Sequence, residues 1–289
     1  MSAVLGLVDI VTVARRDRPQ DAPQLSTTII EPADVRSEDR VDVVLFPPNL
    51  TGQRGANDSH RHAWTRAQHS AGAASWSACA GAFWLGHAGL LDGRPMTTHW
   101  ALEDEFRATF PRARLETDQL IVDDNDIVTA GGVMAWVDLG LHLLHRWMGP
   151  EVVSQTCRQM LIAPGHRDQR SYRTFRPKLT HGDAAIRRSQ VWMEAHISDV
   201  LTIDTLAKQA SLTPRTFQRR FALATGLPPS DYVQVLRIEK ARGLLERTAL
   251  PISQIAWSVG YQDVAAFTRA FKSVCGTTAG NYRKRFSVL

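Results

Sequence analysis

The sequence contains little cysteine and no long apolar run, and these two shortages exclude several classes of protein. Three cysteines occur among 289 residues, an odd and small number that argues for a reducing compartment and against a disulfide framework. No signal peptide is evident. The uncharged run at 71–91 is built mainly of Ala, Gly and Ser and contains His87. We therefore interpret it as a buried strand and helix, not a membrane span, and expect a soluble, cytoplasmic protein.

Motifs for metals and nucleotides are also missing. The chain has no CxxC or HExxH motif, no carboxylate cluster that would complete a metal site and no Walker-type loop. The pairs His60 with His62 and His142 with His145 lack the further ligands that a metal site requires. We interpret these histidines as surface or core residues, and we expect neither a metal nor a cofactor.

One pattern occurs twice in the last third of the chain, at a separation of fifty residues. Its members are Phe217, Arg219, Phe221, Gly226 and Tyr232 in the first copy and Phe267, Arg269, Phe271, Gly276 and Tyr282 in the second. In each copy the two phenylalanines are spaced to lie one helical turn apart on a buried stripe, with the arginine on the opposite side. The glycine ends the helix, because it tolerates the left-handed conformation of a C-cap.

A second short helix and a tight turn precede each copy. The first turn supplies Thr213 as N-cap and Pro214 at the first helical position, and the second supplies Gly260 at the bend and Asp263 as N-cap. These are helix-turn-helix signatures. A single connecting helix at 230–245, apolar on two faces, would place the two second helices in successive major grooves, about 34 Å apart.

The exposed side of each second helix supplies the candidate DNA-binding residues. They are Arg215, Gln218 and Arg219 in the first helix and Ala265, Ala266, Arg269 and Lys272 in the second. Arginine and glutamine read guanine and adenine edges, so the first helix offers more groups that discriminate bases. One such helix alone could equally be an amphipathic helix with solvated arginines, whereas the duplication favours DNA binding.

These motifs make 186–286 resemble the DNA-binding domain of the AraC family of transcription regulators. Two stretches carry the resemblance, TLAKQASLTPRTFQRRFALATGLPPSDYVQVLRIEKARGLL and ISQIAWSVGYQDVAAFTRAFKSVCGTTAGNYRKRF. One departure is Ala279, where the family usually has a proline. The resemblance implies double-stranded DNA as a partner, homodimerisation through the preceding domain and, for an activator, contact with RNA polymerase.

The charge distribution separates the same region from the rest of the chain. From position 184 onward there are 15 Lys and Arg against 7 Asp and Glu, a net charge of +8, while the remainder is net −3. A basic third is the electrostatic footprint of a phosphate-binding module. The stretch at 164–183 is rich in Arg, Gly and Pro and is predicted to be a linker. We expect domains at 1–163 and 184–289.

The first 163 residues alternate between helical and strand patterns. Helices are predicted at 4–14 and 133–147, and strands at 41–46 and 73–78. This alternation indicates an α/β sandwich with a mostly parallel sheet. In such sheets ligands bind beyond the carboxyl ends of the strands.

A small-x-Cys-x-Gly run centred on Cys79 follows the second of these strands. A cysteine at a sharp strand-to-helix turn is typical of a nucleophile elbow, where the helix N-terminus can lower the thiol pKa. The stretch 78–100 resembles the class I glutamine amidotransferase-like superfamily in its PfpI-type branch, and more closely that domain as fused to AraC modules in GlxA-like regulators. The resemblance implies a flavodoxin-like fold, in which Cys79 pairs with His99.

Three departures from that superfamily argue against catalysis. The chain begins at the first helix, so the first strand and its acidic residue are expected to be missing, with Ala3 near the position of the acid. The loop after the 41–46 strand is Pro47-Pro48-Asn49, and proline has no N–H to offer an oxyanion. No carboxylate to orient His99 is identifiable. Cys79 is then a structural or ligand-lining residue, or a redox or covalent sensor.

The sequence therefore predicts a transcription regulator and not an enzyme. Its parts would be an amidotransferase-like sensory and dimerisation domain, a basic linker and a double helix-turn-helix domain. A small-molecule effector would bind near Asn49, Cys79 and His99. The alternative is a Cys-dependent hydrolase or amidase with accessory DNA binding.

Overall fold

The computed structural model describes residues 2–15, 20, 22–29, 40–49, 54–163 and 168–288. The chain forms two compact units, Met1–Gln169 and Arg170–Leu289. The division falls within the segment predicted to be a linker, of which residues 164–167 lie outside the described part. Among the described residues, every helix is too short or too polar to cross a membrane.

The first unit is an α/β sandwich, as the sequence predicted. Its elements are α1 Ser2–Ala14, β1 Val43–Phe46, α2 Ser59–Ser70, β2 Ala74–Ala78, η3 Cys79–Gly81, α3 Ala82–His87, β3 Pro95–Met96, η4 Trp100–Leu102, α4 Glu103–Thr109, β4 Arg114–Leu115, β5 Ile121–Asp124, β6 Ile127–Ala130, η5 Val133–Ala135 and α5 Trp136–Gln159. The main sheet has the order β1-β2-β6-β5. The first three strands are parallel and β5 is antiparallel to β6, which confirms a mostly parallel sheet. In the described part of the chain, α1 is the first element.

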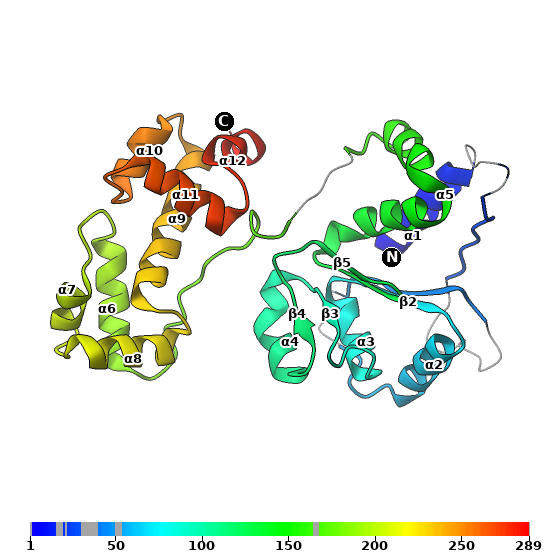
Figure 1. Ribbon diagram of the computed structural model, residues 1–289, viewed down its shortest axis with the longest axis horizontal. Helices are drawn as coiled ribbons and strands as arrows, with labels where there is room; N and C mark the ends of the chain where they lie inside the picture. Colours follow the sequence, from blue (N-terminus) through cyan, green and yellow to red (C-terminus); the bar gives the residue numbers. More distant parts are fainter. Residues whose placement is uncertain are drawn as a thin grey trace. The chain divides into compact units, whose positions relative to one another are not determined.

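Helices cover both faces of this sheet. Figure 1 shows α1 and α5 on one face and α2 and α3 on the other. Alternate side chains of each strand enter the two layers. Thus Val43 of β1 packs in the layer of α1 and α5, where Trp76 is fully buried, and Val44 packs in the opposite layer with Phe83. Because both faces of β1 are covered, its four residues Val43–Phe46 form a continuous apolar run.

Helix α5 extends beyond its predicted end. The sequence pattern predicts a helix to residue 147, whereas α5 continues to Gln159 across a kink at Gly149, whose φ is 84°. Pro150 follows the kink and begins a new helical segment, because proline cannot donate to the preceding turn. The amphipathic period breaks at this kink, so the pattern ended where the helix bends.

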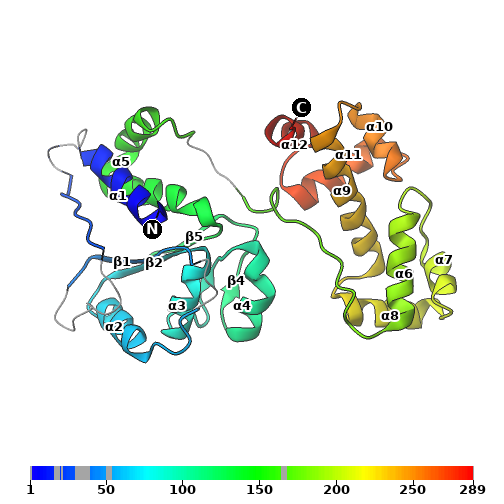
Figure 2. The same cartoon turned by 180° about the vertical axis from the view of Figure 1, so that it is seen from behind.

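The second unit contains only helices among its described residues. They are α6 Ala184–Ala195, α7 Ile203–Gln209, α8 Pro214–Thr225, α9 Pro229–Arg247, α10 Ile252–Ser258, α11 Val264–Cys275 and α12 Ala279–Phe286. Figure 2 shows α6, α7 and α8 beside one end of α9, with α10, α11 and α12 at the other end. Tyr232 and Leu236 of α9 join the first core, and Ile238, Ala241 and Leu245 join the second. The predicted two-faced connecting helix is confirmed.

The predicted helix ends are confirmed in both halves of this unit. The side chain of Thr213 accepts a hydrogen bond from Thr216 N, and that of Asp263 accepts from Ala265 N and Ala266 N. The helices α8 and α11 then end at glycines in the left-handed region, with φ of 80° and 72°. The local sequence therefore sets both ends of α8 and of α11.

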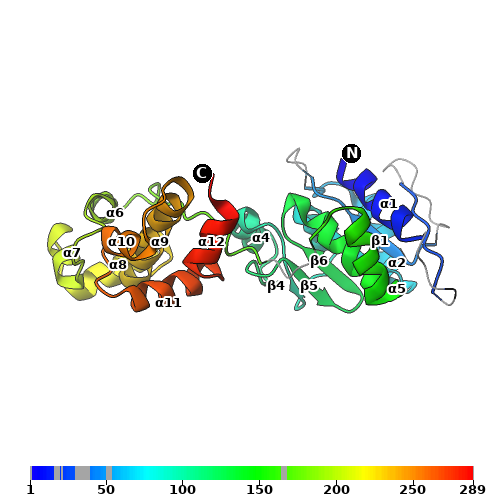
Figure 3. The ribbon, with the colours of Figure 1, turned by 90° about the horizontal axis from the view of Figure 1, so that it is seen from above.

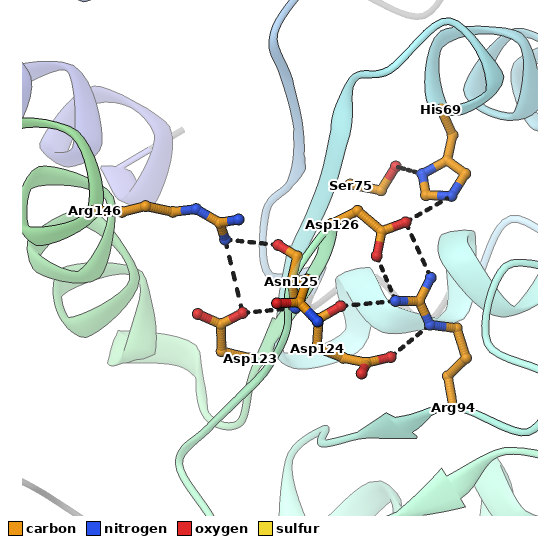
Figure 4. A network of polar contacts seen from close by, with 8 residues as sticks. All are labelled: His69, Ser75, Arg94, Asp123, Asp124, Asn125, Asp126 and Arg146. Carbon is orange, nitrogen blue, oxygen red and sulfur yellow. Dashed lines mark hydrogen bonds and ion pairs between the residues drawn. The ribbon is translucent and has the colours of Figure 1, made fainter.

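The turn between β5 and β6 is held by a network of polar contacts (Figure 4). Arg94, directly before β3, donates from Nε to Asp124 Oδ2 at 2.5 Å and from Nη1 to Asp126 Oδ2 at 3.1 Å. His69 of α2 lies 3.2 Å from the same Asp126 carboxylate and contacts Ser75 of β2. The hydrogen bonds from Arg94 lower the pKa of Asp126, against a smaller effect of burial.

We predict that Arg94→Met lowers the free energy of unfolding of the first unit by about 1 kcal/mol at pH 7, a modest cost because the carboxylates are partly solvated. The pKa of Asp126 is lower in the folded than in the unfolded state, so its contribution is present above its ordinary pKa of about 3.9 and is lost as the pH falls. Urea unfolding followed by tryptophan fluorescence at pH 7 and pH 3.5 measures both effects. A loss in Arg94→Met that is equal at both pH values would contradict this assignment.

Candidate functional site

Helix α8 presents a basic face to solvent. Phe217 and Phe221 are fully buried in the first helical core, where the ring of Phe221 meets the ring of Tyr232 edge-on at 5.0 Å. On the other side of α8, the side chains predicted to contact DNA are exposed. They are Arg215, Gln218 and Arg219. The buried rings therefore orient these polar groups outward.

Helix α11 repeats the arrangement with different exposed groups. Phe267 and Phe271 are buried. Ala265, Arg269 and Lys272 are exposed, and Ala266 is half-buried. Arg269 lies 3.9 Å from Asp263 with both side chains largely exposed, a weak pairing that leaves the guanidinium accessible. In Figure 3, α8 and α11 lie along the same side of the second unit.

Arg220 does not belong to the exposed face, although it follows Arg219 directly. Its Nε and Nη2 donate to the two carboxylate oxygens of Asp183 at 2.9 and 2.8 Å. Asp183 is the N-cap of α6, and the pair lowers its pKa. Arg220 thus ties α8 to the start of α6, while its neighbour remains free to face a ligand.

Arg237, which no sequence motif marks, joins the two halves of the second unit. It donates from Nε to Ile197 O at 3.1 Å and from Nη2 to Asp199 O at 2.7 Å. Its guanidinium also lies over the ring of Tyr261, in the turn before α11, at 5.6 Å. Gly260 allows this contact, because a Cβ there would lie 2.7 Å from Arg237 Nη2. An arginine on a connecting helix gives no sequence signal for such a role.

A second residue that no sequence motif marks, Arg242, is buried beside α12. Its Nε donates to Tyr282 Oη at 2.9 Å and its Nη2 donates to Ser171 O at 2.8 Å. Tyr282 in turn donates to Glu246 at 2.5 Å. The equivalent tyrosine of the first copy, Tyr232, accepts from Gln190 Nε2 at 3.0 Å. The repeated tyrosines thus share a place in the core but have different hydroxyl partners.

The first unit contains a sharp turn at Cys79, directly after β2. Cys79 has a φ of 53° and is 4% exposed, a strained conformation for a residue with a side chain. Two residues later the chain requires Gly81, because a Cβ at this position would lie 2.3 Å from Phe46 O. The end of β1 therefore passes close against the start of the helical turn.

The expectation that this turn lowers the thiol pKa is wrong. Burial raises the pKa of Cys79, and the opposing effects of Ala80 N–H, the Arg54 charge and Gly132 N–H are smaller. The helix that follows is split into a short 3-10 turn and the six residues of α3. At neutral pH the protein therefore holds Cys79 as a thiol, which is a poor nucleophile.

His99 directly follows a residue that hydrogen bonds to the backbone of Cys79. Thr98 Oγ1 donates to Cys79 O at 2.8 Å, which brings the two segments together. His99 Nδ1 accepts from Ala101 N at 3.1 Å, and burial lowers its pKa. The imidazole is therefore neutral with its proton on Nε2. Among the described residues, no carboxylate hydrogen bonds to this ring.

Asn49 lies at the same edge of the sheet as Cys79. It follows the end of β1 by three residues and is half-buried, and β1 runs parallel to β2. The carboxyl ends of the two strands thus bring Asn49 and Cys79 to one edge, where ligands bind in open α/β sheets. The intervening Pro47 and Pro48 have no N–H groups.

The histidines considered as metal ligands have other neighbours. His142 Nε2 lies 2.8 Å from Asp123 Oδ2, and the ring of His62 stacks on that of His87 at 5.5 Å. Within the described ranges, no group of three His, Cys, Asp or Glu residues could hold a metal ion.

The described structure thus has an α/β domain, followed along the chain by a helical domain with two helix-turn-helix units, each of which exposes basic side chains on its second helix. Residues 19–146 match the DJ-1/PfpI family and residues 206–285 match a helix-turn-helix domain family. The chain belongs to the AraC family, in the group whose N-terminal domain is of the DJ-1/PfpI type.

Two curated regulators and one solved domain are similar to parts of this chain. The HTH-type transcriptional regulator ArgR of Pseudomonas aeruginosa is 32% identical over 210 residues, which cover 72% of this chain and 63% of that protein. GlxA of Rhizobium meliloti is 30% identical over 71% of this chain and 63% of its own length. The C-terminal domain of the response regulator AraT from Geobacillus stearothermophilus is 30% identical with a TM-score of 0.36, covering 37% of this chain and 88% of that domain. The chain spans 56–64% of the length of the first curated relatives it matches.

We predict that Arg237→Met destabilises the second unit by about 2 kcal/mol, because it removes hydrogen bonds from a charged group to two carbonyls. It should also uncouple the two halves. The amides of α7 and of α10 should then differ in their protection from exchange, instead of sharing the same protection. Exchange measured by mass spectrometry with increasing urea tests this. Arg247→Met, at an exposed position of the same helix, is the matched control and should change little. Common protection in Arg237→Met would refute the joining role.

Proposed function

We propose that the protein is a sequence-specific transcription regulator that places α8 and α11 in successive major grooves of double-stranded DNA. The observation that carries this proposal is the pair of recognition helices, each with buried phenylalanines on one side and exposed polar groups on the other. The net charge of +8 from position 184 onward favours approach to phosphates. The sequence relatives are HTH-type transcriptional regulators.

The two helices have unequal roles in recognising the DNA sequence. On α8, Arg215, Gln218 and Arg219 can donate to base edges. On α11, Arg269 and Lys272 are the groups able to reach the DNA, and the small side chains of Ala265 and Ala266 allow close approach. The first helix then selects the sequence, and the second mainly binds the phosphate backbone.

The first domain would act as the sensory and dimerisation module. A homodimer would double the two half-sites on the DNA, and an activator would also contact RNA polymerase. A small-molecule effector would bind at the sheet edge near Asn49, Cys79 and His99. A chromosomal target implies a cytoplasmic location.

We also propose that the first domain is not catalytic. The thiol pKa of Cys79 is raised by burial, and the available proton of His99 is on the nitrogen that a general base would need free. The rival function, a Cys-dependent hydrolase, requires a thiolate and an accepting imidazole. Neither is present in the protonation states that this environment favours.

Arg219→Ala should weaken binding to the selected site by about 1–3 kcal/mol and relax specificity at one or two base pairs. Lys272→Ala should weaken specific and random DNA alike and reduce the salt slope by about one unit. Binding selection from random DNA, followed by titrations at several salt concentrations, measures both effects. Arg158→Ala, an exposed arginine of the first unit, is the control. An unaltered motif and undiminished affinity for Arg219→Ala would remove the basis for this assignment.

The purified protein should not turn over amide, aldehyde or peptide substrates, because Cys79 is held as a thiol without an effective base. Cys79→Ser should leave DNA affinity without effector nearly unchanged. Product formation followed by mass spectrometry across a panel of such substrates tests this. Turnover that is abolished by Cys79→Ser would establish the hydrolase function instead.

A further inference from the structure

Gln169, the last residue of the first unit, holds the loop that carries His99. Its side chain is 3% exposed. Nε2 lies 3.1 Å from Thr97 Oγ1 and 2.9 Å from both Thr98 O and Gln119 O. Oε1 accepts from Trp100 N at 3.0 Å. One buried amide thus shares its two N–H groups among three acceptors and receives a fourth hydrogen bond.

The surroundings of Gln169 are shaped to fit this side chain. A Cβ on Gly131 would lie 2.0 Å from Gln169 Nε2, so only glycine leaves room for the amide. The backbone is held as well, since Gln169 N donates to Asp118 O at 2.9 Å and Asp168 forms a bridge with Gln119. Both the main chain and the side chain of Gln169 are therefore part of the first unit.

The loop held by Gln169 borders the site near Cys79. Thr98 donates to Cys79 O, and His99 follows directly. Because the carbonyl of Thr98 and the N–H of Trp100 both bond to Gln169, His99 lies between two points of attachment to the same side chain. Any ligand that moves this loop must change the hydrogen bonds of Gln169.

The residues immediately after Gln169 are held by the second unit. Ser171 is 3% exposed, and its Oγ donates to Cys275 O at the end of α11 at 2.8 Å. The carbonyl of Ser171 accepts from the buried Arg242 at 2.8 Å. Along the chain, Arg170 alone separates the residue held beside the effector site from the residue held at the end of a recognition helix.

We propose that Gln169 is a positioning residue that couples the effector site to the DNA-binding helices. Ligand binding against the 97–100 loop alters the hydrogen bonds of Gln169, and the change reaches Ser171 and the end of α11 through a single intervening residue. This inference rests on the proposed function, because it takes the region near Cys79 and His99 as the effector site. Coupling is reciprocal, so DNA binding must in turn alter the 97–100 loop.

Reciprocity allows a test that needs no effector. The full chain is first used to select its binding sequence from random DNA. Amide exchange of peptides covering 97–101 is then measured without DNA, with random DNA and with the selected DNA. In the wild-type protein, the selected DNA should change the exchange rate of the Trp100 amide by at least about fivefold relative to random DNA, the lower end of typical coupling.

Two variants and a control locate the coupling. In Gln169→Ala the Trp100 amide should exchange faster without DNA, and the effect of selected DNA should fall below about twofold, which is weaker than typical coupling. Gly131→Ala should have the same effect, because its Cβ displaces the Gln169 amide without changing that residue. Gln119 is exposed, and only its backbone carbonyl accepts a hydrogen bond from Gln169. Gln119→Ala keeps that carbonyl and should therefore behave as the wild type.

The outcomes separate this inference from the function on which it rests. If no sequence is selected, the proposed DNA-binding function fails. If a sequence is selected but Trp100 exchange in the wild type does not respond to it, the coupling is refuted while the function stands. If the response persists in both Gln169→Ala and Gly131→Ala, Gln169 is not the coupling residue.

Discussion

Helix α9 has to bury apolar side chains on two different faces, and the arrangement of the second unit depends on this requirement. Tyr232 and Leu236 belong to one core, and Ile238, Ala241 and Leu245 belong to the other. Because one rigid helix is shared, the two recognition helices have a defined separation and orientation. Arg237 adds a polar link between the halves. The proposed binding to two successive grooves of DNA would benefit from this rigidity, since a flexible joint would lose affinity to conformational entropy.

In the first unit, burial acts on the ionisation of a cysteine in a motif associated with catalysis. The turn at Cys79 has the strained backbone of a nucleophile elbow, yet burial outweighs the neighbouring N–H groups and raises the thiol pKa. His99 is likewise neutral and bonded to the backbone. The turn thus has a left-handed residue at Cys79, while burial favours the uncharged forms of Cys79 and His99. An effector at this site, as proposed, would meet uncharged side chains at Cys79 and His99.

The limits of prediction from sequence follow the range of the interactions involved. The caps at Thr213 and Asp263 are satisfied by residues two or three positions away, so local sequence was enough to find them. Gln169 bonds to residues 50–72 positions distant, and Arg242 reaches Ser171 across 71 positions. Nothing in the neighbouring sequence marks these partners. The segment that contains Gln169 was therefore assigned to a linker on its composition alone.

The sequence by itself determined the α/β and all-helical domains, the duplicated helix-turn-helix units, the exposed side of each recognition helix and the turn at Cys79. These features arise from periodicity, from helix caps and from glycines that short segments specify. Only the tertiary structure decided the protonation of Cys79 and His99, the continuation of α5 past Gly149, and the roles of Arg237, Arg242 and Gln169. The reason is physical: desolvation and long-range hydrogen bonds depend on which distant segments surround a group, and that is set only when the chain folds.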